Sequence, residues 1–259
     1  MEEQSVLLEK KGKIAWITLN RPQSLNSMND VLVDELHKAL DYATCNDNIK
    51  AVVLTGNGKA FCAGGDLPYL ETLKSLSEKK AFIEKVGQLA KKITIMQKPV
   101  IAMVNGVAAG AGANLMLACD LIYAADNARF AQSFVKVGLV PDCGGMYFLP
   151  KTVGLHKAKE LMFTADLIDA KEADKLGMIN HVLPAADLVR ETEAMAIKLA
   201  ESAPLAIAFT KATLNKTDME LDDVLSAEGS TQTLCLGTAD CAEGIAAFKE
   251  KRVPNFTGK

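Results

Sequence analysis

The stretch GLVPDCGG, residues 138–145, places one carboxylate, Asp142, between a proline and a pair of glycines. An aspartate in such a turn often hydrogen-bonds its own main chain. A carboxylate held beside an apolar run such as FVKVGLV can instead act as a general base. The adjacent thiol, Cys143, has no histidine nearby in the sequence to activate it, so we expect an unreactive buried cysteine there.

Two glycine-rich segments follow predicted strands: AFCAGGDL, residues 60–67, and GVAAGAGANL, residues 106–115. Glycine lets a main chain approach a ligand closely, and the second segment also opens a predicted helix whose free N–H groups favour negative charge. Two such donors from separate loops would form an oxyanion hole. The alternative is that small residues only permit close strand–helix packing. Neither segment has the pattern of a phosphate-binding loop.

Composition excludes several functional classes. A net charge of −3 and scattered basic residues indicate no nucleic-acid partner. Six cysteines without CxxC spacing and three distant histidines predict no metal site, and cysteines in apolar surroundings favour a cytoplasmic protein with reduced thiols. The uncharged segment 99–119 is long enough to span a bilayer, but Asn105, Asn114 and glycines interrupt it. We therefore expect a buried strand, a loop and a buried helix, and no membrane association.

These loops need a scaffold, and the order of predicted elements indicates an α/β fold with a parallel sheet. Short β-branched strands alternate with amphipathic helices along the first part of the chain. Ser27 or Asn29 could cap the first helix. From about residue 155 the pattern is helical, with a long amphipathic run over 187–199. The predicted strands cover 14–20, 51–57, the segment PVIAMVNG and 120–126, and the predicted helices cover 76–96 and 110–118.

Taken together, these motifs resemble the crotonase, or enoyl-CoA hydratase/isomerase, superfamily. The segment IAMVNGVAAGAGANLMLACDL, residues 101–121, is similar to the family signature, and FCAGGDL is similar to its first oxyanion loop. RPQSLNSMN resembles the adenine-side loop, and EGIAAFKEKRVPNFTGK resembles the C-terminal helix and tail.

The resemblance implies a crotonase-like spiral of ββα repeats over residues 1–195, followed by a helical trimerisation region over residues 196–259. It implies an acyl-CoA substrate, with coenzyme A as part of that substrate and no separate cofactor. It also implies self-association as a homotrimer or as a hexamer built from two trimers.

Site residues follow by position. The oxyanion donors correspond to the N–H groups of Gly65 and Ala111. Leu25 and Asn26, together with the main chain of Ala63, Gly64, Asp66 and Leu67, correspond to the pantetheine and adenine channel. For the Asp66 side chain we favour a cap on its own loop instead. Phe248 and Lys251 correspond to residues that a neighbouring subunit offers to the adenine and its phosphates, although a solvated helix face explains Lys251 equally well.

The sequence departs from the hydratases at their two working glutamates. Asn114 and Phe134 occupy these positions, and neither side chain can accept a proton from water. Asp142 lies where other members carry a single working carboxylate. The motifs GVAAGAGA and PDCGG and the tail PNFTGK are most similar to the ring-1,2-epoxyphenylacetyl-CoA isomerases, which also move a double bond from Δ3 to Δ2.

We therefore predict an acyl-CoA isomerase in which Asp142 transfers a proton within the substrate. Apolar neighbours such as Phe134, Val140 and Phe148 are expected to raise the pKa of Asp142. On an epoxide, the same residue would assist ring rearrangement. Two alternatives stay open: a hydratase or hydrolytic enzyme that uses Asp142 to activate water or to attack carbon, and a CoA-ester-binding protein without catalysis.

Overall fold

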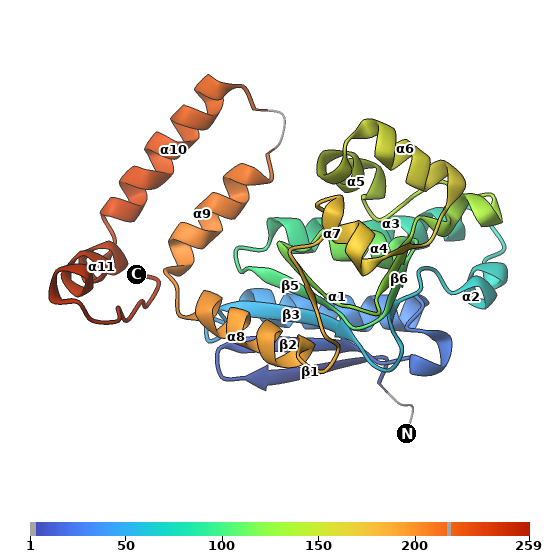
Figure 1. Cartoon of the computed structure of the whole chain (residues 1–259), viewed down its shortest axis with the longest axis horizontal. Helices are drawn as coiled ribbons and strands as arrows, with labels where there is room; N and C mark the ends of the chain where they lie inside the picture. The colour runs from blue at the N-terminus through green and yellow to red at the C-terminus, as the bar shows by residue number, and fades with distance from the viewer. Residues whose placement is uncertain (1–3, 217–218) are drawn as a thin grey trace.

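A computed structural model describes residues 4–216 and 219–259 and contains two sheets flanked by helices (Figure 1). The larger sheet has the order β1-β2-β3-β5-β7-β10, antiparallel only between β1 and β2. The smaller sheet has the order β4-β6-β8-β9. The strands of the first are β1 (Val6–Lys11), β2 (Ile14–Leu19), β3 (Ala51–Gly56), β5 (Val100–Val104), β7 (Leu121–Ala125) and β10 (His181–Leu183), and those of the second are β4 (Ala60–Cys62), β6 (Val107–Ala109), β8 (Arg129–Ala131) and β9 (Ile168–Asp169).

The chain builds these sheets by repeating one unit. After β3 it adds β4 to the smaller sheet, after β5 it adds β6, and after β7 it adds β8, each time before a helical segment. This is the expected ββα spiral, and the fold class is confirmed. The strands of the smaller sheet are only two or three residues long, which explains why β4 reads as part of a glycine-rich loop in the sequence.

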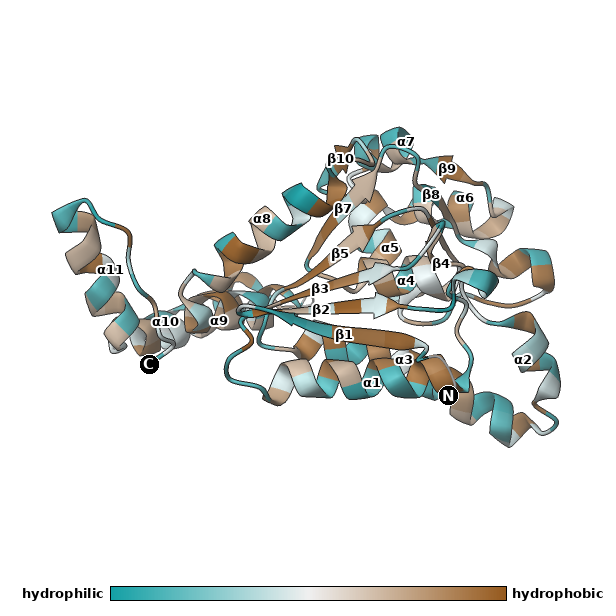
Figure 2. Ribbon diagram, turned by 90° about the horizontal axis from the view of Figure 1, so that it is seen from below, coloured by the Kyte–Doolittle hydropathy of each residue, from teal (hydrophilic) through white to brown (hydrophobic). Residues whose placement is uncertain are grey.

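Both faces of the central strands of the larger sheet are buried. Along β2 and β3, alternate side chains enter opposite clusters, as the two-residue period of a strand requires: Ile17 and Leu54 face one, Trp16 and Val53 the other. Helices α1 (Asp30–Cys45) and α3 (Leu76–Ile95) belong to the first cluster, and α8 (Leu188–Ala200) closes the second. The apolar strands accordingly lie between these two helical layers (Figure 2).

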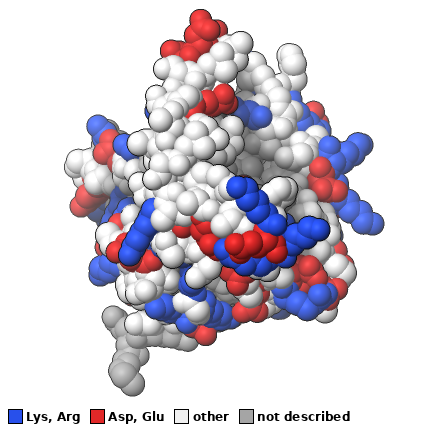
Figure 3. Space-filling model, turned by 90° about the vertical axis from the view of Figure 1, so that its left-hand side faces the viewer, with Lys and Arg blue, Asp and Glu red and all other residues white. Residues whose placement is uncertain are grey.

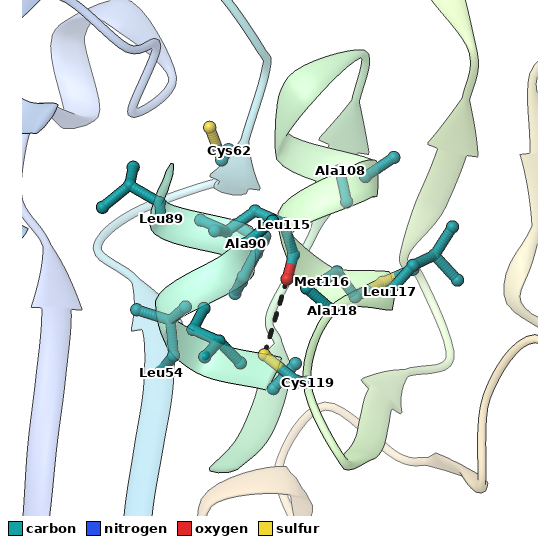
Figure 4. Packing of buried hydrophobic residues seen from close by; sticks show 14 of the residues in the cluster. Leu54, Cys62, Leu89, Ala90, Ala108, Leu115, Met116, Leu117, Ala118 and Cys119 are labelled. Carbon is teal, nitrogen blue, oxygen red and sulfur yellow. Dashed lines mark hydrogen bonds between the residues drawn. The ribbon is translucent and has the colours of Figure 1, made fainter. Parts of the chain in front are cut away.

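Helix α4 (Ala111–Leu117) is buried along its whole length. Its Leu115 and Met116 belong to the same cluster as Leu89 and Ala90 of α3 (Figure 4). A Cβ on Gly112 would collide with the carbonyl oxygen of Cys62, so the small residues of this segment do permit close packing. Within residues 4–216 and 219–259, no helix has the length and apolar character needed to cross a bilayer.

The remaining elements lie around this core: the 3-10 helices η1 (Pro22–Ser24) and η2 (Ser133–Val137), and helices α2 (Leu67–Thr72), α5 (Gly145–Val153), α6 (Leu155–Thr164), α7 (Ala170–Lys175), α9 (Pro204–Leu214), α10 (Leu221–Leu236) and α11 (Ala239–Glu250). Helices α9 to α11 project from the body (Figure 1), and α10 contains no buried side chain among the described residues. On their face of the molecule, acidic and basic groups are interspersed (Figure 3).

Helix α8 runs continuously across position 195/196 and packs on the sheet, so the boundary expected there lies inside a core helix. The projecting part begins at α9. Lys211 of α9 is buried and donates to Asp120 at 2.7 Å, which ties this helix to the core. Trimerisation through these helices stays a prediction.

Candidate active site

A cavity of about 250 Å³ opens beside the start of α4. It brings together the three residues predicted to do chemistry, Gly65, Ala111 and Asp142, although they come from three separate parts of the chain. Ala63, Gly64, Leu67 and Phe134 also line it. The rest of the described lining consists of Met28, Leu70, Phe82, Ile83, Val86, Gly110, Ser133, Lys136, Val137 and Leu139.

The N–H groups of Gly65 and Ala111 have no acceptor in the described part of the protein. Gly65 follows β4, and Ala111 is the first residue of α4, where main-chain N–H groups lack partners within the helix. Gly64, directly before Gly65, packs against the loop that leads to Ala111. It has a φ of 100°, and a Cβ there would lie 2.9 Å from the carbonyl oxygen of Ala109. Glycine at 64 therefore lets the two loops approach each other with both donors facing a cavity.

The carboxylate of Asp142 is largely enclosed. Its Oδ1 atom is buried and has no hydrogen-bond partner among the described residues. Burial raises the pKa of Asp142 to about 6, against a weaker opposing effect of its own main-chain N–H. The buried ring of Phe134 lines the same cavity, as predicted. Val140, in contrast, is 73% exposed, so the prediction that it shields Asp142 is wrong. Phe148 lines a different cavity, beside α9.

Asn114, at the position of the first hydratase glutamate, is fully buried on α4. Its Nδ2 donates to the main-chain carbonyl oxygen of Asp142 at 2.9 Å, and its Oδ1 accepts from Gln132 Nε2 at 2.8 Å. Asn114 is not among the residues that line the cavity. Its amide is therefore engaged by the protein, and it is not placed to hold a water at the reacting carbons.

Three residues of the predicted coenzyme A channel, Leu25, Asn26 and Asp66, lie outside the cavity. Leu25 is 42% exposed with a φ of 52°, at the end of η1. Asn26 is fully buried, and its side chain bonds to the main chain of Asn57, Ala60 and Arg21 at 2.8–2.9 Å. A contact between the Asn26 side chain and coenzyme A is therefore not supported.

The Asp66 side chain performs the structural role we favour. It caps α2 by accepting from the N–H of Tyr69 at 3.1 Å, and it pairs with Arg21 at 2.7 Å. Burial alone would raise the pKa of Asp66, but the hydrogen bond and charge of Arg21, together with hydrogen bonds from the N–H of Tyr69 and from Ser27, outweigh it and lower that pKa. The pair joins the loop before α1 to the oxyanion loop.

Phe248 and Lys251 lie on the projecting part of the chain. Phe248 of α11 is 87% exposed, and Lys251 ends that helix with a φ of 56°. Phe248 lines a separate apolar cavity between α9, α11 and the C-terminal tail. Neither residue reaches the cavity of Asp142 within one subunit, so their role toward a neighbouring subunit's ligand stays a prediction.

Arg21 and Gln132 contact residues of the candidate site, and reasoning from the sequence did not single them out. Arg21 braces the oxyanion loop through Asp66, and Gln132 orients the amide of Asn114. Gln132 stands two residues before Phe134 in the sequence, and this proximity was the only sequence feature that could have indicated its place near the site. The apolar wall that Leu70, Phe82 and Val86 form also depends on packing between α2 and α3, which no local pattern reveals.

The cysteine at position 143 is a buried thiol, as predicted. Burial raises its pKa well above the ordinary range, which leaves it protonated and unreactive. Across the described residues, no cluster of His, Cys, Asp and Glu side chains is suited to a metal ion.

Comparison with known proteins identifies the family to which the chain belongs. The family model for enoyl-CoA hydratase/isomerase matches residues 9–259. The chain is 36% identical to a crotonyl-CoA hydratase of Syntrophomonas wolfei, covering 100% of both chains, and 37% identical to the 1,2-epoxyphenylacetyl-CoA isomerase of Escherichia coli, covering 96% of this chain and 97% of that protein. The crystal structure of an enoyl-CoA hydratase from Bacillus anthracis superposes with a TM-score of 0.95 at 32% identity, covering 99% and 100% of the two chains. The chain belongs to the enoyl-CoA hydratase/isomerase family and has the crotonase fold.

Proposed function

We propose that this member of the enoyl-CoA hydratase/isomerase family isomerises an acyl-CoA thioester, moving a double bond from Δ3 to Δ2 with Asp142 as the only acid and base. One observation carries the proposal: a single cavity holds the Asp142 carboxylate and two free main-chain donors, while positions 114 and 134 hold no ionisable group. The acyl-CoA is the substrate, and the proposed steps use no further cofactor.

The reaction needs one proton and no water. With the thioester oxygen accepting from the N–H groups of Gly65 and Ala111, the carbon next to the carbonyl becomes more acidic. An oxygen of Asp142 takes a proton from this α-carbon, and the electrons of the broken C–H bond delocalise into a dienolate whose charge rests on the thioester oxygen. Asp142 then gives the proton to the γ-carbon, the carbonyl re-forms, and the double bond lies between the α- and β-carbons.

The state of Asp142 suits both steps. A pKa of about 6 leaves the carboxylate mostly ionised at neutral pH, yet makes it a stronger base than an exposed aspartate. After the first step the same group is the acid that the second step requires. The two-glutamate route to hydration uses a pair of carboxylates, whereas a proton shuttle needs one.

The cavity favours a largely apolar acyl group. Leu70, Phe82, Val86 and Phe134 form much of its described lining, which contains one acidic residue, Asp142, and one basic residue, Lys136. A cavity of about 150 Å³ is enough for benzene, so the volume found here leaves room for a six-carbon ring or chain as well as the thioester. This also agrees with rearrangement of a ring epoxide, in which Asp142 would move a proton in the same way.

The deciding experiment uses Asp142→Asn, a near-isosteric change that removes the base. We expect it to lower the rate of trans-3-enoyl-CoA isomerisation by ~10²–10⁴ while the affinity for a saturated acyl-CoA stays near the wild-type value. Exchange of α- and γ-hydrogens in D₂O should fall in parallel. Unchanged isomerisation by Asp142→Asn would overturn the proposal.

A hydratase that uses the same aspartate is the second candidate, because relatives such as the protein of Syntrophomonas wolfei are named crotonyl-CoA hydratase. Fast hydration of crotonyl-CoA by the wild type, lost in Asp142→Asn, would favour it. A covalent adduct trapped on Asp142 would instead indicate a hydrolytic enzyme. Tight binding of CoA esters with no turnover of any of them would indicate a binding protein.

We also propose that α9 to α11 assemble subunits into trimers or hexamers. The many exposed apolar side chains there, including Leu221, Leu234 and Phe248, support association. Sedimentation of the intact protein would test it.

A further inference from the structure

We infer that Asn114 is a positioning residue, whose buried amide holds the main chain at Asp142 so that the carboxylate stays in the cavity. The inference rests on the proposed role of Asp142. It gives a function to a side chain that occupies the position of a hydratase glutamate and yet does not face the cavity.

The carbonyl oxygen of Asp142 is held from two directions. It accepts from Asn114 Nδ2 at 2.9 Å and from the main-chain N–H of Gly145 at 2.9 Å. Gln132 Nε2 donates to Asn114 Oδ1 at 2.8 Å, which fixes which end of the Asn114 amide faces Asp142. Because Asn114 and Gln132 are both buried, these bonds do not compete with water.

The turn needs such external support. Cys143, directly after Asp142, has a φ of 49°, a left-handed conformation that a residue with a Cβ disfavours. Strained main chain of this kind persists only where its surroundings determine it. Asn114 belongs to the fully buried helix α4, so the hydrogen bond from its amide fixes the position of the turn relative to the core.

Gly145 makes this contact possible. A Cβ at position 145 would collide with the side-chain amide of Asn114. The glycine after the turn is therefore matched to the asparagine on α4. A glutamate at 114 would offer only acceptors when ionised, so it could not donate to the Asp142 carbonyl.

Two variants test the inference independently. Asn114→Leu keeps the branched shape of the side chain and removes the donor, and Gly145→Ala keeps the donor but displaces it. Gly145 has no positive φ, so alanine strains no main chain there. Gly87→Ala in α3 is the matched control, because a Cβ at 87 meets nothing within 4 Å.

For both variants we expect kcat for isomerisation to fall by about 10–100-fold, the scale of a small misplacement of a catalytic group, with KM within about twofold because binding is not touched. The acid limb of the pH–rate profile should move to lower pH, since a carboxylate released to solvent is easier to ionise. Gly87→Ala should match the wild type. In an Asp142→Asn background, Asn114→Leu should cause no further loss, because both changes act through one group.

Wild-type kcat with an unmoved acid limb in both variants would overturn the inference, and so would a full additional loss in the double variant. Loss of acyl-CoA binding together with kcat would also contradict it, since that would indicate general damage to the site. If Asn114→Leu does not fold, Gly145→Ala decides alone. These results are distinct from a failure of the proposed function, which would appear as unchanged isomerisation by Asp142→Asn.

Discussion

A Cβ built on Gly64 would lie 2.9 Å from the main-chain carbonyl oxygen of Ala109, so the loop after β4 and the loop before α4 meet at a separation that only glycine allows. Gly65, the next residue, lines the same cavity as Ala111, and the main-chain N–H donors of both have no acceptor among the described residues. The donors belong to the main chain, so their contribution can be removed only by a change that removes the N–H itself.

Gly65→Pro removes this N–H, and we expect the isomerisation rate to fall by ~10²–10³. The matched control is Gly65→Ala, which keeps the donor. Its Cβ would lie 3.3 Å from Leu70 Cδ1, the end of a flexible side chain that can move. Steady-state kinetics of both variants check the prediction. Equal activity of the proline and alanine variants would show that the donor at 65 is not used.

The pH dependence of kcat/KM should report Asp142. Only the ionised carboxylate can accept the α-proton, so the rate should be constant above the pKa and fall as pH drops below about 6. The measurement is a pH–rate profile from pH 4.5 to 8 with a non-titrating substrate, in which a rate that stays constant down to pH 4.5 would contradict the assignment.

Asp142 should also make the protein less stable at neutral pH. Its folded pKa is raised above the unfolded value, so the native state binds the extra proton and stability falls as pH rises from about 4 to 6. Asp142→Asn should therefore raise the free energy of unfolding at pH 7.5 by up to about 3 kcal/mol, with little effect at pH 4. Urea unfolding at the two pH values measures this. A loss of stability at pH 7.5 would show that the carboxylate is not in an apolar site.

The pair between Arg21 and Asp66 should matter for stability more than an exposed pair does. Arg21→Leu leaves a mostly buried carboxylate without its partner and should cost about 3 kcal/mol at neutral pH. Because the pKa of Asp66 is lowered, this contribution is present above the usual aspartate pKa and is lost as pH falls through the lower folded value. Chemical unfolding at pH 7 and in acid tests the sign.

The control for that experiment is Arg190→Leu. Arg190 is exposed and pairs with Asp187 and Glu191 at the surface, so the change should cost much less stability than Arg21→Leu. Similar losses for the two arginine variants would refute the special role of Arg21.

Much of the scaffold was predictable because it depends on local patterns. The β-branched runs at 14–20 and 51–57 are strands, and Asn29 caps α1 by accepting from Leu32 N–H, as its position indicates. The smaller sheet was not predictable in detail. Its strands are too short to carry a period, and they are defined by pairing with residues far along the chain.

The candidate site also has residues that local sequence features predict and residues that they do not. Gly65, Ala111 and Asp142 were predictable because loop chemistry and a family resemblance place them. The role of Asn114 was not, because it depends on the direction of one amide inside the core. Nor did sequence proximity identify the neighbours of Asp142: Val140, two residues away, faces solvent, whereas Phe134, eight residues away, lines the cavity.

The proposed mechanism separates substrate activation from proton transfer. In it, activation would depend on main-chain atoms at 65 and 111, which side-chain substitutions barely alter, while proton transfer would depend on the position of one carboxylate on the wall of the same cavity. For protein engineering, this means that the main-chain donors can stay fixed while the catalytic carboxylate is moved. New reactions on CoA esters would come from placing a carboxylate at another position of the cavity wall, together with its supporting amide and glycine.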